Sequence, residues 1–157
     1  MVQFYGSDSD LSFRSAPCGL TPYPELYLFA VSTVRELHMK TICDLDPSLL
    51  IQFPALEILA LVNVARFPAL FALLAAEPVL CPSLKIIAFL NCDLKANVIR
   101  ELEETVAKRK NSTAARLYKV VIVSQPGRFL DHDLILRLRG FVPCVDVRID
   151  DKLPDLS

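Results

Sequence analysis

The sequence is poor in the residues and motifs on which many catalytic and metal-binding sites depend. Its 157 residues include four glycines and two histidines, with no C-x-x-C pair and no G-x-S-x-G motif. A nucleotide site in a doubly wound sheet needs a glycine-rich loop that enters a helix, and a nucleophilic serine elbow needs the G-x-S-x-G pattern. The chain is therefore not expected to bind a nucleotide or to present such a serine.

The five cysteines are odd in number and widely scattered. This arrangement indicates neither a zinc site nor a disulfide framework. Four of the five lie beside apolar segments, where a free thiol behaves as a small buried hydrophobic group. We expect no metal and no cofactor, and we expect a reducing intracellular compartment, either the cytoplasm or the nucleus.

An excess of charge and a long apolar run are also missing. The formal net charge of −1 argues against broad electrostatic binding to nucleic acid. The longest apolar stretch, residues 53–76, is interrupted by Glu57, Asn63 and Arg66 and by two prolines. Its last uninterrupted part is about half the length of a membrane-spanning helix, and no signal-peptide pattern follows the first residue. We expect neither a nucleic-acid nor a membrane partner.

Apolar residues, in contrast, are abundant. They make up 53% of the chain, which excludes a disordered protein and exceeds the usual share for soluble domains. Either the core is large or some apolar surface is covered by another molecule. The length favours a single domain spanning residues 1–157.

Much of this apolar content follows a repeat. The segment LKIIAFLNCDL, residues 84–94, is apolar at relative positions 1, 4, 6 and 11 and has Cys92 at position 9. That spacing is the signature of a leucine-rich repeat. Four further segments keep the 1-4-6 spacing, with start-to-start distances of 22, 28, 33 and 25 residues. The repeat strands are expected near residues 34–39, 56–61, 84–89, 117–122 and 142–147.

Segments compatible with helices lie between the expected strands. They are residues 24–32, 47–52, 67–77, 95–110 and 131–139, with Gly140 ending the last of them. In the segment 95–110, Val98, Ile99, Leu102, Thr105 and Val106 form an apolar stripe at helical spacing. The basic run 108–110 is interpreted as a solvated helix end. Residues 2–5 and 11–15 are typical of edge strands separated by a turn.

These elements predict an α/β leucine-rich-repeat-like solenoid with about five parallel strands and with helices on the outer face. A single strand–helix unit cannot bury its own apolar face, so stacked units share one core. The residues at positions 1, 4 and 6 point into that core. Parallel neighbours joined by helical connections also satisfy the right-handed crossover rule.

Four segments resemble a known group of proteins. They are FPALEILAL, CPSLKIIAFLNCDL, ARLYKVVIVS and VPCVDVRIDDKLPDL, and they resemble the C-terminal leucine-rich-repeat regions of fungal F-box proteins, especially the basidiomycete sets. The resemblance covers about residues 2–156. In that family an N-terminal F-box docks on the Skp adaptor of a cullin ubiquitin ligase, and the repeats hold the protein substrate.

This chain contains no F-box pattern. The resemblance therefore implies the repeat fold and the substrate-holding role, but no adaptor-binding residue. The chain is expected to be a fragment or a truncated relative, which would reach a cullin-ligase adaptor only through the missing F-box region. We expect a non-enzymatic protein-interaction module, the substrate-recognition part of an F-box-type ubiquitin ligase subunit.

The residues that alternate with the inward positions are expected to face the concave surface and to bind a protein substrate or partner. Its centre is apolar and its two ends are charged. The predicted partner-binding residues are Val62, Ile86, Leu90, Val121 and Val123 in the centre, with His38 and Arg148 at the ends. Near-continuous apolar strands are also normal where both faces of a parallel sheet are covered. Intramolecular cover by the N-terminal region therefore remains an alternative.

A second hypothesis of another class is a small doubly wound enzyme with its site near Ser124–Asp133. His132 lies between two aspartates, either of which could orient it as a base. The same D-H-D pattern is typical of a helix N-terminus, where acidic residues cap the first turn. The enzyme hypothesis requires Ser124, His132 and an acidic residue within hydrogen-bond reach of one another.

Overall fold

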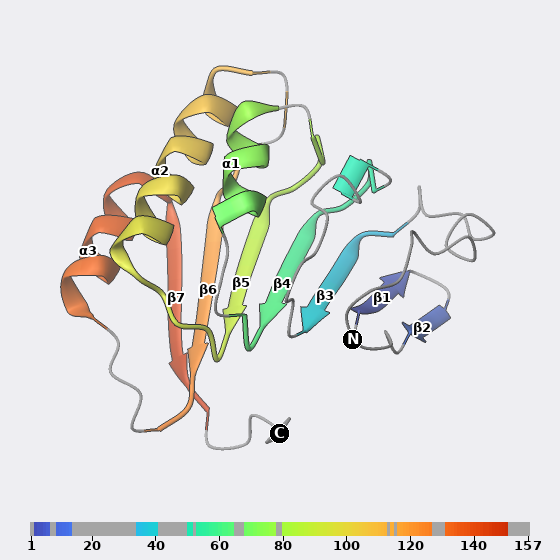
Figure 1. Ribbon diagram of the computed structural model, residues 1–157, viewed down its shortest axis with the longest axis horizontal. Coiled ribbons are helices and arrows are strands. Elements are labelled where there is room, and N and C mark those ends of the chain that lie inside the picture. The colour runs from blue at the N-terminus through green and yellow to red at the C-terminus, as the bar shows by residue number, and fades with distance from the viewer. Residues whose placement is uncertain are drawn as a thin grey trace.

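The computed structural model contains one mixed sheet with helices packed against it (Figure 1). It describes residues 2–6, 9–13, 34–40, 50–51, 53–64, 68–77, 80–112, 114, 116–126 and 131–150. In these residues the sheet has seven strands, in the order β2-β1-β3-β4-β5-β6-β7. The strands are β1 (Val2–Gly6), β2 (Ser9–Phe13), β3 (Glu36–Lys40), β4 (Ile58–Val62), β5 (Ile86–Leu90), β6 (Lys119–Ser124) and β7 (Cys144–Ile149).

The five strands β3 to β7 are parallel and lie side by side in chain order. This arrangement confirms the predicted α/β class and the predicted parallel strands. Each strand begins two residues later than the repeat pattern suggests. In the units of β4 and β5, the first repeat position closes a turn instead of joining the sheet. The amide of Leu56 donates to the carbonyl of Phe53, and that of Leu84 donates to the carbonyl of Cys81. Both leucines are fully buried below the sheet.

The first two strands form an antiparallel hairpin, and β1 pairs with the free edge of β3. The prediction of edge strands is confirmed for β2 but wrong for β1, which lies between β2 and β3 and pairs with both. The hairpin extends the sheet beyond the first parallel strand, so β3 has hydrogen-bonded neighbours on both sides.

In the described part of the chain, three helices cover one face of the parallel strands (Figure 1). They are α1 (Pro68–Ala76), α2 (Ala96–Lys110) and α3 (His132–Phe141). The inward strand side chains form two rows, Leu37-Leu59-Ile87-Val120-Val145 and Met39-Leu61-Phe89-Ile122-Val147. These rows share one core with side chains of all three helices. The rings of Phe71 in α1 and Phe89 in β5 lie 6.1 Å apart.

The predicted stripe of α2 faces this core. Four of its members are buried, and Val106 is half-buried. The hydroxyl of Thr105 donates to the carbonyls of Phe71 in α1 and Glu101 in α2, at 3.2 and 2.9 Å. A threonine can therefore occupy a core position, because its polar atom is satisfied there.

Both ends of α3 are set by local chemistry. Asp131 is the N-cap, and its carboxylate accepts a hydrogen bond from the amide of Asp133 at 2.9 Å, which confirms the capping interpretation of the D-H-D pattern. The prediction that Gly140 ends the helix is wrong, because the helix continues to Phe141. Val142 precedes a proline and has extended backbone angles, and the residue before proline disfavours helical geometry.

The solvated helix end predicted at residues 108–110 is also wrong in one residue. Lys108 and Lys110 are exposed, but Arg109 is only 1% exposed. Its guanidinium donates to the carbonyls of Leu80 and Cys81 at 2.9 Å and to that of Leu84 at 3.4 Å. Arg109 thus ties the C-terminal turn of α2 to the loop that precedes β5.

Burial shifts the pKa values of two side chains at this contact, Arg109 and Cys81. It lowers the pKa of Arg109 from its usual value and raises the pKa of the Cys81 thiol to about 11. The thiol is therefore neutral at physiological pH, and it donates to the carbonyl of Leu50 at 3.4 Å.

Of the helices predicted near the N-terminus, residues 24–32 lie outside the described residues. The segment 47–52 is described only at residues 50–51, which form a short 3-10 turn.

Candidate partner-binding face

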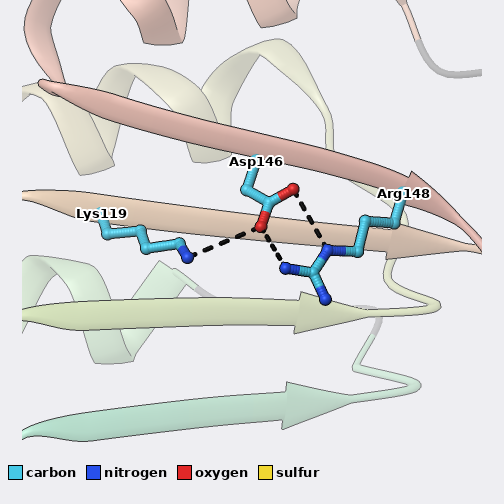
Figure 2. Close-up of polar contacts among 3 residues, drawn as sticks. All are labelled: Lys119, Asp146 and Arg148. Carbon is cyan, nitrogen blue, oxygen red and sulfur yellow. Dashed lines mark hydrogen bonds and ion pairs between the residues drawn. The ribbon is translucent and has the colours of Figure 1, made fainter.

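The face of the parallel sheet that is turned away from the helices is the candidate site, and we call it the open face. Side chains alternate between the two faces of a strand, so the open face contains the residues that flank the buried ones. Figure 2 looks onto this face, with the helices behind the strands. The described side chains of the open face are Glu36, His38, Ile58, Ala60, Val62, Ile86, Ala88, Leu90, Lys119, Val121, Val123, Cys144, Asp146 and Arg148.

The centre of the open face is apolar. The register places Val62, Leu90 and Val123 beside one another on β4, β5 and β6, and Arg148 on β7 continues the same row. Leu90 and Val123 are half-buried, as are Ile86 and Val121. Val62 was expected to be exposed, but it is only 8% exposed. It is a short side chain on a strand with paired neighbours on both sides, so adjacent groups shield it.

Two alanines separate the larger apolar side chains on β4 and β5. Ala60 and Ala88 are paired in register, and both are buried. Each lies two residues from a larger apolar side chain on either side along its own strand. The middle row of this region therefore carries much smaller side chains than the rows that flank it.

A charged cluster of Lys119, Asp146 and Arg148 lies on the open face at the edge of the sheet formed by β6 and β7 (Figure 2). Both carboxylate oxygens of Asp146 accept hydrogen bonds from Arg148, through Nε and one terminal nitrogen. The Nζ atom of Lys119 lies 3.5 Å from Asp146 Oδ2. The Arg148 hydrogen bond holds the pKa of Asp146 below its usual value, and Asp146 in turn raises the pKa of Arg148. The cluster therefore contains one anion and two cations.

The opposite end of the open face is formed by β3. His38 Nε2 and Glu36 Oε1 lie 2.6 Å apart, and both side chains are partly exposed. His38 therefore lies on the face away from the core, as predicted. The register separates it from Arg148 by the full width of the parallel sheet, so the two predicted charged ends do not form one site.

Two asparagines at the carboxyl ends of β4 and β5 have structural roles that were not predicted from the sequence. Asn63 and Asn91 both have left-handed backbone angles, with φ of 53° and 55°. Asn91 Nδ2 donates to Asn63 Oδ1 at 2.6 Å, and the amide of Asn63 donates to the carbonyl of Leu90 at 2.9 Å. Both follow directly after a strand in the sequences LVN and FLN. This recurrence, together with the tolerance of asparagine for left-handed angles, is the signal that could have revealed them.

We expect replacement of Asn91 by alanine to lower the free energy of unfolding by about 1–2 kcal/mol, because a Cβ-bearing residue without a local hydrogen bond disfavours left-handed angles. Asn91→Gly keeps this backbone accessible and should be the less harmful change. Urea denaturation followed by circular dichroism measures both variants, with Asn97→Ala on the exposed side of α2 as the control. An equal loss for Asn91→Ala and Asn91→Gly would show that the side-chain bond, and not the backbone angle, dominates.

The alternative site near Ser124 and His132 is not assembled in the structure. Ser124 is buried, and its hydroxyl donates to the carbonyl of Gln125 at 3.4 Å. His132 is exposed at the first residue of α3. Within the part of the chain that the structure describes, no hydrogen bond joins Ser124 to His132 or to an acidic side chain.

Two other kinds of feature are absent from the described residues. Among the described residues, no group of three or more histidine, cysteine, aspartate or glutamate side chains is arranged to hold a metal ion. Nor does any helix in the described ranges have the length and apolar character needed to cross a bilayer. Comparison of the chain with protein-family models, with curated proteins and with solved structures gives no match.

Proposed function

We propose that this chain is a non-enzymatic protein-interaction module built on leucine-rich-repeat-like units, and that its open face binds a protein partner. The observation that carries the proposal is the set of half-buried apolar side chains gathered on that face. Ile58, Ile86, Leu90, Val121 and Val123 lie on three adjacent strands. Contiguous apolar surface of this kind marks interaction sites on globular proteins.

The repeat interpretation is supported by equivalent contacts in successive units. Repeat positions 1, 4 and 6 supply the buried rows, and position 8 is an asparagine in the units of β4 and β5. Cys92 at position 9 donates through Sγ to the carbonyl of Leu61 on the neighbouring strand at 3.1 Å. In the β5 unit this thiol satisfies a backbone carbonyl where the chain leaves the sheet. Stacked units that share one core are the physical basis of a solenoid.

The position of the helices supports a binding role for the uncovered side. Purely parallel sheets are normally covered by helices on both faces. Here α1, α2 and α3 lie on the same face (Figure 1). Within the described residues, the apolar side chains of the open face therefore have no helical cover of the kind that the inward rows have, and a protein partner is the cover that we propose.

The resemblance to fungal F-box proteins makes the proposal more specific. On that basis the chain is the substrate-recognition part of an F-box-type ubiquitin ligase subunit, and its contact with the cullin-ligase adaptor requires an F-box region that this sequence does not contain. The buried free thiols of Cys81 and Cys92 suit a reducing compartment, so we place the protein in the cytoplasm or nucleus.

The test is the capture of binding proteins from a cell extract by the wild-type chain and by Leu90→Arg. The substitution puts a charge in the centre of the open face, and we expect at least about a tenfold loss of specific partners, since an interface centre tolerates an unpaired charge poorly. Leu136→Arg is the matched control. It introduces the same change at a leucine of α3 that is 51% exposed, and it should leave capture intact.

Two results would contradict the proposed function. One is a set of captured proteins that is identical for the wild-type chain and Leu90→Arg. The other is a loss that occurs equally with Leu136→Arg, because such a loss would place the binding surface on the helices or reflect a nonspecific effect of added charge.

A further inference from the structure

The cluster of Lys119, Asp146 and Arg148 gives the open face a net positive charge at one end. Two cations surround one carboxylate, which leaves an excess charge of +1. The Arg148 side chain is 63% exposed. Its contacts with Asp146 use Nε and one terminal nitrogen, and the other terminal nitrogen makes no hydrogen bond within the described residues. Donor groups of both cations are therefore available to an incoming ligand.

Asp146 also fixes the direction in which Arg148 points. A bidentate pair between a guanidinium and a carboxylate holds the two groups in a common plane. In Figure 2 the guanidinium of Arg148 extends from β7 across β6, on the face turned away from the helices. Val123 on β6 and Leu90 on β5 occupy the same row as Arg148. An oriented cation thus lies next to the apolar centre of the open face.

We propose that the open face recognises an extended peptide segment that combines apolar side chains with an acidic side chain. The apolar side chains cover Ile86 and Leu90, and the aspartate or glutamate of the segment binds Arg148 and Lys119. The inference rests on the proposed function and adds the chemistry of the partner. It commits to a protein segment whose carboxylate belongs to a side chain and not to the C-terminus.

The geometry also sets the spacing of the two recognised groups. Neighbouring strands lie about 4.8 Å apart, and alternate side chains of an extended peptide lie about 6.6 Å apart on one side. A segment that crosses the strands with an apolar side chain over Leu90 therefore presents its next side chain on the same side over β6. Because the Arg148 guanidinium extends over β6 (Figure 2), the acidic residue is placed two positions from the apolar one.

A basic side chain does not suit this end of the face. The only carboxylate of the cluster is already engaged by both Lys119 and Arg148. An added lysine or arginine would meet two like charges and one saturated anion. Like charges across an interface suppress the wrong partners, so the cluster selects for the sign of the charge on the segment.

The experiment selects binders from a displayed library of random 12-residue peptides on the full chain, with Leu90→Arg used to remove peptides that bind elsewhere. We expect the surviving peptides to contain an apolar residue followed or preceded, two positions away, by aspartate or glutamate. Synthetic peptides with amidated C-termini, which lack a terminal carboxylate, are then titrated by fluorescence anisotropy. Replacing the acidic residue by its amide should weaken binding by about five- to tenfold, as expected for a charge-assisted hydrogen bond.

A double-mutant cycle assigns this effect to the cluster. On Arg148→Ala the acid-to-amide change in the peptide should cost less than about twofold, since Arg148 is gone and the charge of Lys119 is balanced by Asp146. Arg100→Ala is the control, because it removes an exposed arginine of α2, away from the open face. It should preserve the full acid-to-amide effect. Circular dichroism establishes that each variant is folded.

The outcomes distinguish a failure of this inference from a failure of the proposed function. Peptides that require Leu90 but contain no acidic residue, or whose affinity is unchanged on Arg148→Ala, overturn this inference and leave the proposed function standing. Enrichment of basic residues at the same spacing overturns it as well. A selection that yields no peptide dependent on Leu90 counts against the open face as a peptide-binding surface, and therefore against both.

Discussion

Replacement of Arg109 by alanine is expected to lower the free energy of unfolding by about 3–5 kcal/mol, because several buried carbonyl groups lose their hydrogen-bond donor. The guanidinium donates to three carbonyls in the loop before β5. Each buried acceptor left without a donor costs about 1–3 kcal/mol, and the cavity left by the side chain adds to the loss. Urea denaturation of the purified chain, followed by circular dichroism, measures the change.

The neighbouring residues supply matched controls for this prediction. Lys108→Ala and Lys110→Ala remove cations from the same helical turn, but both lysines are exposed, so each should change stability by less than about 0.5 kcal/mol. Arg109→Lys should give an intermediate loss, because a single ammonium cannot match the fork of a guanidinium. A loss for Arg109→Ala as small as that of the lysine variants would show that the three carbonyls find other donors.

The burial of Arg109 could not be predicted from the sequence. The apolar stripe of α2 was visible in the sequence, and Arg109 lies on that stripe, seven residues after Leu102 and four after Thr105. Its charge and its position between two lysines suggested solvent. Only the folded chain shows that loop carbonyls converge on this position. A helical period locates the buried face, but it does not reveal what the polar groups on that face will meet.

The parallel strands were predictable for a related reason. Positions 4 and 6 of each unit are two residues apart, so their apolar side chains lie on one face of the strand by strand geometry alone. The two-residue offset of β4 and β5 was not predictable, because it depends on the turns closed by Leu56 and Leu84. The paired asparagines at the carboxyl ends of β4 and β5 likewise require the register between strands.

Some features of the open face could likewise be predicted from the sequence, and others could not. The alternation of side chains along a strand is sufficient by itself to place Leu90 and Arg148 on one face. The contact of Lys119 with Asp146 follows from the pairing of β6 with β7, and the burial of Val62 follows from its crowded position in the sheet. Sequence identifies which face a side chain occupies, whereas neighbours on adjacent strands determine its exposure and its partners.

Opposite responses to the same substitution are expected at two leucines of the β5 unit. Leu84 is 1% exposed in the core below the sheet, and Leu84→Arg should unfold the chain. A buried unpaired charge costs several kcal/mol, in addition to the loss of leucine packing, and this total is comparable with the whole stability of a domain. Leu90 is half-buried on the open face. Leu90→Arg can extend its charge into water, so its free energy of unfolding should fall by about 1 kcal/mol or less.

The comparison between these two variants tests which face of the sheet is exposed to solvent, and it does not require a binding partner. Far-UV circular dichroism and urea denaturation should show a folded Leu90→Arg chain with a cooperative transition, and a Leu84→Arg chain without one. If Leu90→Arg unfolds as completely as Leu84→Arg, the open face belongs to the interior, because only a covered position leaves the arginine no route to solvent. A folded Leu90→Arg chain would instead establish that the open face at Leu90 is accessible to solvent, as binding of another molecule requires.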